Sequence, residues 1–166
     1  MERKRYVGRL TNEDYARIFD RTTGLGIVRA AWDLLILDED KRVALVQRDI
    51  PPELGTWHLP GGKINGGESF QEFASRVAKH DLGIGVEFVD AVGGLNFPAE
   101  VSTMEVEGEE RELTIHTVST ILLCKPLSAG LRGSAEGKNV GWFATAPKPA
   151  HSVHIPWLLK HGYLQA

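Results

Sequence analysis

The sequence has few of the features that define several protein classes. Its 166 residues include a single cysteine, Cys124, so an internal disulfide cannot form. Leu122 and Leu123 beside it favour a buried thiol, and low cysteine usage is typical of a reducing compartment. Residues 1–10 contain no apolar core of a secretory signal. We therefore expect a cytoplasmic location.

Long hydrophobic runs and an excess of charge are also missing. Apolar stretches such as Leu34–Leu37 are far shorter than the about 20 residues of a membrane helix, so no membrane association is expected. The 19 basic and 22 acidic side chains give a formal net charge of −3. Because a nucleic-acid backbone is bound by clustered positive charge, composition gives no support for a nucleic-acid partner. A small anionic ligand depends only on local arrangement.

What is present fits an ordinary globular domain. Apolar residues make up 42% of the chain and charged residues 25%, and we find neither a repeat nor a low-complexity tract. The length suits a single domain over residues 1–166. Collagen, a simple coiled coil and wholesale disorder are therefore excluded for the chain as a whole.

The hydrophobic pattern predicts more strands than helices. We expect the first two strands to form a hairpin, because only the acidic turn Asp38-Glu39-Asp40 and its neighbours separate them. The mixed order, with one long central helix, predicts an α/β sandwich around a mixed sheet. The expected strands cover residues 27–37, 43–47, 57–59, 86–95, 113–123 and 140–144, and the expected helices cover 11–19, 68–82 and 155–161.

The segment with chemical content runs from Gly61 to Ile84. A glycine-rich loop leads there into the central helix, and Gly83 stands where a left-handed helix cap is usual. Small residues let backbone N–H groups approach phosphate oxygens, and the start of a helix carries partial positive charge. The segment therefore predicts a diphosphate site, with a simple turn as the plainer alternative.

The spacing within this segment resembles the signature box of the Nudix hydrolases. The match covers Gly62, Glu68, Arg76, Gly83 and Ile84. The resemblance implies the Nudix fold, in which a loop–helix–loop lies beside a mixed β-sheet. It also implies hydrolysis of a nucleoside diphosphate linked to another group, with Mg²⁺ or a similar hard cation as cofactor.

The box departs from the family pattern at three positions. Val77, His80 and Asp81 stand where the family normally has metal-binding glutamates. Valine cannot bind a metal, and a neutral imidazole nitrogen is poorly matched to Mg²⁺. Only Asp81 keeps an acidic oxygen. We therefore expect a site for one cation, held by Asp81, a backbone carbonyl and waters; the plainer alternative is that Asp81 ends the helix without a ligand.

Within the Nudix family, the chain is similar to the GDP-mannose mannosyl hydrolases, which also have a depleted box. The similar segments include Trp32-Asp33-Leu34, the run from Trp57 to Lys63, and the box variant from Arg76 to Gly83. In that subgroup water attacks the anomeric carbon of the sugar. The resemblance implies a nucleotide-sugar substrate, release of nucleoside diphosphate and free sugar, and a homodimer.

The subgroup also implies roles for particular residues. The Gly61 carbonyl and Asp81 would hold Mg²⁺, with Mn²⁺ as an alternative, and Arg48 and Lys63 would contact the diphosphate. We group Glu68 with the metal side of the box and also expect it to pair with Arg76. The substrate-binding candidates are Asp33, Arg48, Lys63, Trp57 and His116.

The general base is the least determined part of the prediction. The subgroup has a histidine in the loop before the last strand, but residues 133–139 contain none. We rank Glu136 first on position, against the plainer alternative of a solvated loop glutamate. Glu109, Glu110 and His116 are the other candidates.

Three further features receive plain interpretations. His151 and His154 are expected to form the polar start of the last helix, and His58 to point outward. The glutamate-rich residues 100–112 predict a solvated hairpin or loop that could act as a lid. The functions left open are a nucleotide-sugar hydrolase, a pyrophosphatase that cuts at phosphorus, and a silent domain that binds a nucleotide or a protein.

Overall fold

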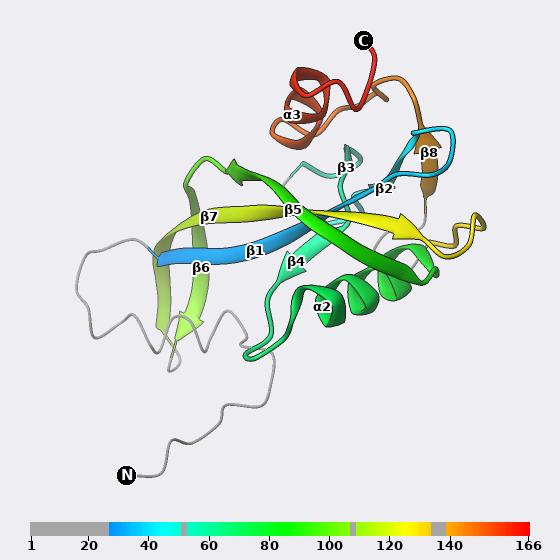
Figure 1. Ribbon diagram of the computed structural model, residues 1–166. Helices are drawn as coiled ribbons and strands as arrows, with labels where there is room; N and C mark the ends of the chain where they lie inside the picture. The colour runs from blue at the N-terminus through cyan, green and yellow to red at the C-terminus, as the bar shows by residue number, and fades with distance from the viewer. Residues whose placement is uncertain (1–26, 51–52, 107–108, 134–138) are drawn as a thin grey trace.

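Two β-sheets form the centre of the protein, as the computed structural model shows for residues 27–50, 53–106, 109–133 and 139–166 (Figure 1). The larger sheet has the order β4-β1-β7-β5, with β6 paired to β7. Strands β1 and β7 are parallel and the other pairs antiparallel, which makes this sheet mixed. Its strands are β1 (Ile27–Ile36), β4 (Gly61–Lys63), β5 (Val86–Asn96), β6 (Glu100–Val106) and β7 (Glu109–Pro126).

The smaller sheet has the order β3-β2-β8 and is antiparallel. Its strands are β3 (Trp57–His58), β2 (Val43–Gln47) and β8 (Val140–Phe143). The predicted hairpin of the first two strands is therefore wrong, since β1 and β2 lie in different sheets and share only the bridge between Leu37 and Val43. Strand β7 pairs with β1 along its whole length, whereas β4 pairs with it only at residues 31–33, and after the bridge β2 pairs instead with β3 and β8.

Helices cover both faces of the larger sheet, which confirms the predicted α/β sandwich. Leu34 and Leu35 are neighbours in β1 that point to opposite faces, and both are fully buried. Leu34 packs in one core with Phe73 of α2 (Phe70–Val77), and Leu35 packs in the other with Leu158 of α3 (His154–Lys160). In Figure 1 the sheet accordingly lies between α2 and α3.

The central helix begins two residues later than the predicted residue 68, and it also ends differently. Ser69 caps α2 by accepting a bond from the N–H of Glu72, whose carboxylate accepts one from Ser69 in return. A single α-helix was expected up to residue 82, but Ala78–Leu82 form a wider π-type turn, η2. The N–H of Gly83 bonds there to the carbonyl five residues back, and Gly83 adopts the predicted left-handed conformation with φ of 66°.

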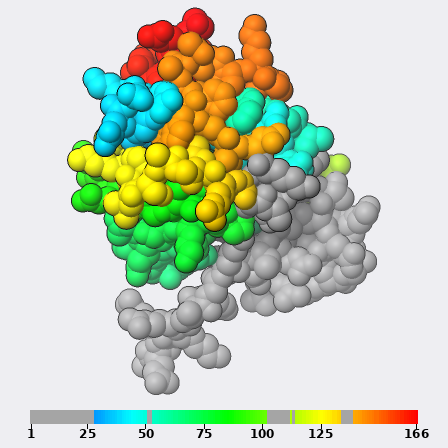
Figure 2. All heavy atoms as spheres, turned by 90° about the vertical axis from the view of Figure 1, so that its right-hand side faces the viewer, coloured from blue at the N-terminus to red at the C-terminus, as the bar shows by residue number. Residues whose placement is uncertain are grey.

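The glutamate-rich residues form a hairpin, one of the two predicted alternatives. Strand β6 pairs with the first half of β7, from Glu100 opposite Ile115 to Val106 opposite Glu109. The predicted helix at 11–19 lies outside the described residues. In Figure 2 the C-terminal segment, orange to red, covers the upper part of the molecule. None of the described helices is both long and apolar enough to cross a membrane.

Candidate active site

A cleft of about 460 Å³ collects side chains from both sheets, from η2 and from the start of α3. They come from strands β1, β4 and β7 with the β5–β6 link, from β2 and β3 with the loop between them, from η2, and from the start of α3. Six of the residues predicted from the sequence line it together: Asp33, Arg48, Gly61, Gly62, Lys63 and Asp81. These positions are as far as 48 residues apart in the chain (81 − 33), so the sheet topology brings them together.

Gly61 and Asp33 fit together as one unit at the floor of the cleft. The antiparallel register of β1 and β4 places them opposite each other, and the N–H of Leu34 donates to the Pro60 carbonyl at 2.8 Å. A Cβ at Gly61 would lie 2.0 Å from Asp33 Oδ1, closer than any real contact. Glycine is therefore required here so that the buried Asp33 carboxylate can approach the glycine loop.

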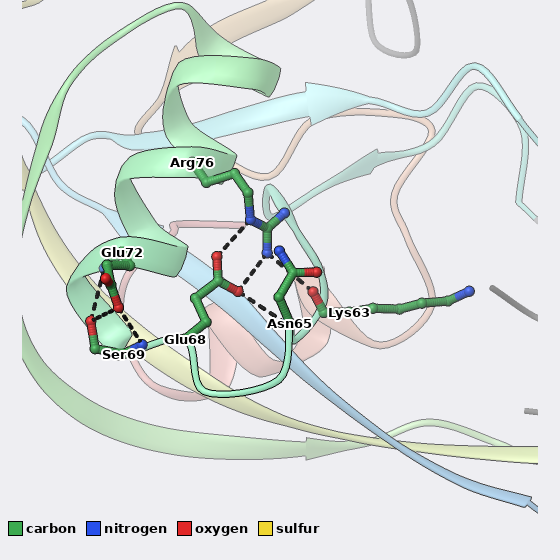
Figure 3. Close-up of polar contacts among 6 residues, drawn as sticks. All are labelled: Lys63, Asn65, Glu68, Ser69, Glu72 and Arg76. Carbon is green, nitrogen blue, oxygen red and sulfur yellow. Dashed lines mark hydrogen bonds and ion pairs between the residues drawn. The ribbon is translucent and has the colours of Figure 1, made fainter. Parts of the chain in front are cut away.

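Glu68 and Arg76 form the predicted pair, and the contact is bidentate (Figure 3). Arg76 Nε donates to Glu68 Oε1 at 2.6 Å, and Nη2 donates to Oε2 at 2.8 Å. Nη2 also reaches the Lys63 carbonyl at 3.2 Å, and the Asn65 N–H donates to Glu68 at 3.1 Å. The hydrogen bonds from Arg76 lower the pKa of Glu68, and those to Glu68 raise the pKa of Arg76. The pair therefore fixes the loop from residue 63 to 68 against α2.

Asp81 is the carboxylate of the box that reaches the cleft. Val77 is buried in the core beneath α2, and His80 is largely exposed with its Nδ1 2.7 Å from Asp81 Oδ1. No group of three or more histidine, cysteine or acidic side chains in the described part of the chain is arranged to hold a metal. One carboxylate and one carbonyl suit a single Mg²⁺, which keeps several waters and binds substrate phosphates.

Two basic side chains of the cleft come from different strands. Arg48 follows β2, where its N–H donates to the Thr56 carbonyl at 2.9 Å and its carbonyl accepts from Gly55 at 2.7 Å. Partial burial lowers the pKa of the Arg48 guanidinium, but an arginine stays charged in a protein. Lys63 ends β4, and Figure 3 shows its side chain extending away from the Glu68–Arg76 pair. The cleft therefore offers positive charge beside the glycine loop.

Comparison with known proteins agrees with this arrangement. Residues 28–146 match the family model described as NUDIX domain, which is more than half of the chain. The chain belongs to the NUDIX domain family. The predicted Nudix fold is thereby confirmed, since the match includes both sheets and the helix that carries the box.

Solved structures of Nudix proteins share the fold. A MutT NUDIX hydrolase from Burkholderia pseudomallei is 26% identical with a TM-score of 0.53, and the match covers 75% of this chain and 91% of that one. An ADP-ribose pyrophosphatase from Streptococcus suis is 21% identical, with a TM-score of 0.55 and coverage of 75% and 80%. A UDP-X diphosphatase is 19% identical, with a TM-score of 0.54 and coverage of 95% and 74%. A search of curated proteins found no match.

Several predicted site residues lie away from the Nudix cleft. The ring of Trp57 packs against Phe143 with a centroid distance of 4.7 Å, inside the core below α3. His116 bonds to Asn96, and its neighbour Thr117 is the β7 residue that lines the cleft. Because side chains alternate along a strand, His116 points to the opposite face. The candidate bases Glu136, Glu109 and Glu110 cannot be placed, since their side chains lie outside the described part of the structure.

Three histidines that received plain interpretations do line the cleft. Trp57 points into the core, and its neighbour His58 points to the opposite face of β3, as the alternation of side chains along a strand requires. That face lines the cleft, whereas the sequence predicted that His58 points outward to solvent. His151 and His154, at the start of α3, lie beside it with ring centroids 4.5 Å apart. The three-residue spacing of this pair was the only sequence signal. Its proximity to His58 depends on β3 lying next to α3, which the spacing does not indicate.

Proposed function

We propose that this Nudix domain hydrolyses a nucleoside diphosphate that is joined to a second group. One observation carries the proposal: a single cleft contains the glycine loop, a carboxylate of the box and the basic side chains of Arg48 and Lys63. Diphosphate oxygens are recognised by backbone N–H groups, by cations and by metal ions, and all three can act here. We expect Mg²⁺, or Mn²⁺ in its place, to be required.

In this proposal Asp81 and the Gly61 carbonyl hold the cation. A bound Mg²⁺ would neutralise charge on the departing diphosphate, and Arg48 and Lys63 would add to that stabilisation. Glu68 has both of its oxygens bonded to Arg76, so we assign it to positioning the loop and not to the metal. The base that activates water remains assigned to Glu136 by position, and a Glu136→Gln variant with normal turnover would remove it.

The finer proposal concerns the substrate. The similarity of the sequence to GDP-mannose mannosyl hydrolases supports a nucleoside diphosphate sugar, with GDP-mannose the first to try. By the same similarity we propose attack of water on the anomeric carbon and a homodimer that works in the cytoplasm. Gel filtration of the purified chain tests the dimer, and elution as a monomer would count against it.

A second candidate is attack at phosphorus. It is favoured by the names of two structures with the same fold, an ADP-ribose pyrophosphatase and a UDP-X diphosphatase. Turnover in H₂¹⁸O separates the two routes, because label in the free sugar requires attack at carbon, whereas label in a phosphate requires attack at phosphorus. Either result supports hydrolysis of the diphosphate compound.

A third candidate is a silent domain that binds ligands without turnover. Burial of Val77 favours it, because this position of the box lies in the core and cannot supply a metal ligand. A panel of nucleoside diphosphate compounds, assayed separately with Mg²⁺ and Mn²⁺, tests it. Binding without any turnover in that panel would select the silent domain over both hydrolases.

A further inference from the structure

The histidines of the cleft form a chamber next to its buried carboxylate. The rings of His151 and His154 have centroids 4.5 Å apart, and that of His58 lies 5.9 Å from His154. Nε2 of His154 is 3.3 Å from Oδ2 of Asp33. The ring of Phe97 closes the chamber edge-on, 5.3 Å from His154. These five residues, which we call the histidine chamber, all line the cleft.

Part of the chamber is buried without hydrogen bonds. The side chains of Asp33 and His154 are 8% and 5% exposed. The approach of His154 to Asp33 is close but not aligned as a hydrogen bond, so Asp33 Oδ2 and both ring nitrogens of His154 have no such partner among the described residues. Burying unbonded polar atoms costs about 1–3 kcal/mol each, so their presence in a cleft indicates a ligand that bonds to them.

The other two rings have assignable tautomers. Nδ1 of His151 accepts the N–H groups of Val153 and His154, at 3.2 and 3.5 Å, so its proton must be on Nε2. Nδ1 of His58 lies 2.6 Å from the Leu59 carbonyl, which can only accept, so Nδ1 carries the proton and Nε2 is an acceptor. The chamber therefore offers both a donor and an acceptor in addition to the unbonded atoms.

The chamber also differs in charge from the diphosphate end of the cleft. Burial, reinforced by neighbouring His154, lowers the pKa of His58 to about 3 and that of His151 to about 4, so both rings are neutral at neutral pH. The nearby Glu53 is engaged by Ser152, whose N–H donates to Oε2 at 2.8 Å and whose hydroxyl donates to Oε1. Asp33 is thus the open carboxyl group of the chamber, and an anion placed beside it would meet no compensating charge from His58 or His151.

We propose that the histidine chamber is the subsite for an uncharged, hydroxyl-bearing group of the substrate, the sugar of a nucleoside diphosphate sugar. A hydroxyl both donates and accepts, so it can bond to Asp33 Oδ2, to His58 Nε2 and to either nitrogen of His154. The ring of Phe97 gives an apolar surface for the carbon face of a pyranose. The inference rests on the proposed function and names the part of the cleft that selects the second group.

Calorimetric titration with two ligand pairs tests the proposal. GDP and GDP-mannose, and UDP and UDP-glucose, are compared with Ca²⁺ in place of Mg²⁺, and product analysis confirms that no turnover occurs. In His154→Leu and His58→Leu we expect the nucleotide sugar to bind about tenfold more weakly, while the nucleoside diphosphate changes less than about twofold. His161→Gln, at the exposed end of α3, is the control and should change neither affinity. Thermal unfolding checks that each variant is folded.

The results separate the two proposals. Equal weakening of both members of a pair, or no weakening of the nucleotide sugar in either variant, overturns the sugar subsite and leaves the diphosphate cleft intact. Failure of the unaltered protein to bind any nucleoside diphosphate or nucleotide sugar overturns the proposed function and the subsite with it. Asp33→Asn tests whether the charge of the chamber repels an anion. The third phosphate of GTP would enter the chamber, so removing the negative charge of Asp33 should strengthen the binding of GTP by several-fold. Weaker or unchanged GTP binding contradicts the charge argument.

Discussion

The loop of Glu68 and the histidine chamber border the same cleft but differ in their hydrogen bonding. Both oxygens of Glu68 are bonded, and its partner Arg76 also holds the Lys63 carbonyl. In the chamber, Asp33 Oδ2 and the nitrogens of His154 are buried without such bonds to any residue that the structure describes. A polar group that is fully bonded at rest contributes to stability, whereas one left unbonded is available to a ligand. The comparison separates the residues that shape this Nudix site from those that we expect to act in it.

The largest expected effect is on turnover, when Asp81, the carboxylate of the box that lines the cleft, is replaced. Asp81→Asn should lower turnover by about 10²-fold or more, because the neutral amide loses the charge that we propose binds Mg²⁺. Its free energy of unfolding should change little. Steady-state turnover at several Mg²⁺ concentrations is the measurement, and near-normal turnover would remove Asp81 from the proposed metal site.

In the Glu68–Arg76 pair, loss of one partner should mainly lower the free energy of unfolding. Arg76→Met leaves the Glu68 carboxylate, whose side chain is 9% exposed, without its bidentate partner. We expect the free energy of unfolding to fall by about 1–3 kcal/mol, at the low end because Arg76 is partly exposed. Urea denaturation measures it. A double variant Glu68→Gln, Arg76→Met should recover part of the loss, and failure to do so would argue against pairing as the cause.

The buried histidines predict a dependence of stability on pH. The pKa values of His58 and His151, about 3 and about 4 in the folded protein, lie below the model-peptide value of about 6.5. Between these values the unfolded chain binds more protons, so stability is fully present above pH 6.5 and is lost as the pH falls toward 4. By pH 5 we expect a loss of about 2 kcal/mol from each histidine, about 4 kcal/mol in all. Denaturation at pH 7 and pH 5 tests this, and His58→Gln should reduce the difference.

The smallest expected effect is on the free energy of unfolding when His154 of the histidine chamber is replaced. His154→Leu replaces a ring whose nitrogens have no hydrogen bonds with an apolar side chain in a largely buried position. We expect stability to be unchanged or to rise by up to about 1 kcal/mol, although binding of nucleotide sugar weakens. A loss of more than about 2 kcal/mol in urea denaturation would show that His154 is structural and would abolish the contrast with Arg76.

Local patterns in the sequence predicted the loop and helix that carry Glu68 and Arg76 well. The spacing of Glu68 and Arg76, and Gly83 at the helix end, depend on contacts within one loop and one helix. The capping pair of Ser69 and Glu72 was also readable, as a serine followed three residues later by a glutamate. Short-range geometry fixes such features, so one sequence suffices.

The chamber could not be predicted in the same way because it depends on long-range packing. His58 and His154 are 96 residues apart (154 − 58). Asp33 lies in the larger sheet, whereas His58 lies in the smaller one. The π-type turn at 78–82 also departs from the 3.6-residue period of the single helix expected over residues 68–82. The α/β sandwich was predictable since alternation and periodicity encode it, but the pairing of β1 with β4 and β7 was not.

The contact between Gly61 and Asp33 has a consequence for how relatives of this chain can vary. The carboxylate fills the space that any other residue at position 61 would need for its side chain. The Trp32 carbonyl would also lie 2.8 Å from a Cβ at that position, so the backbone of β1 as well as the Asp33 carboxylate requires glycine at position 61, and homologous sequences should keep it. Gly61→Ala should be harmful, and Asp33→Ala in the same chain should relieve the side-chain part of the clash but not the contact with the Trp32 carbonyl, so folding should recover only in part.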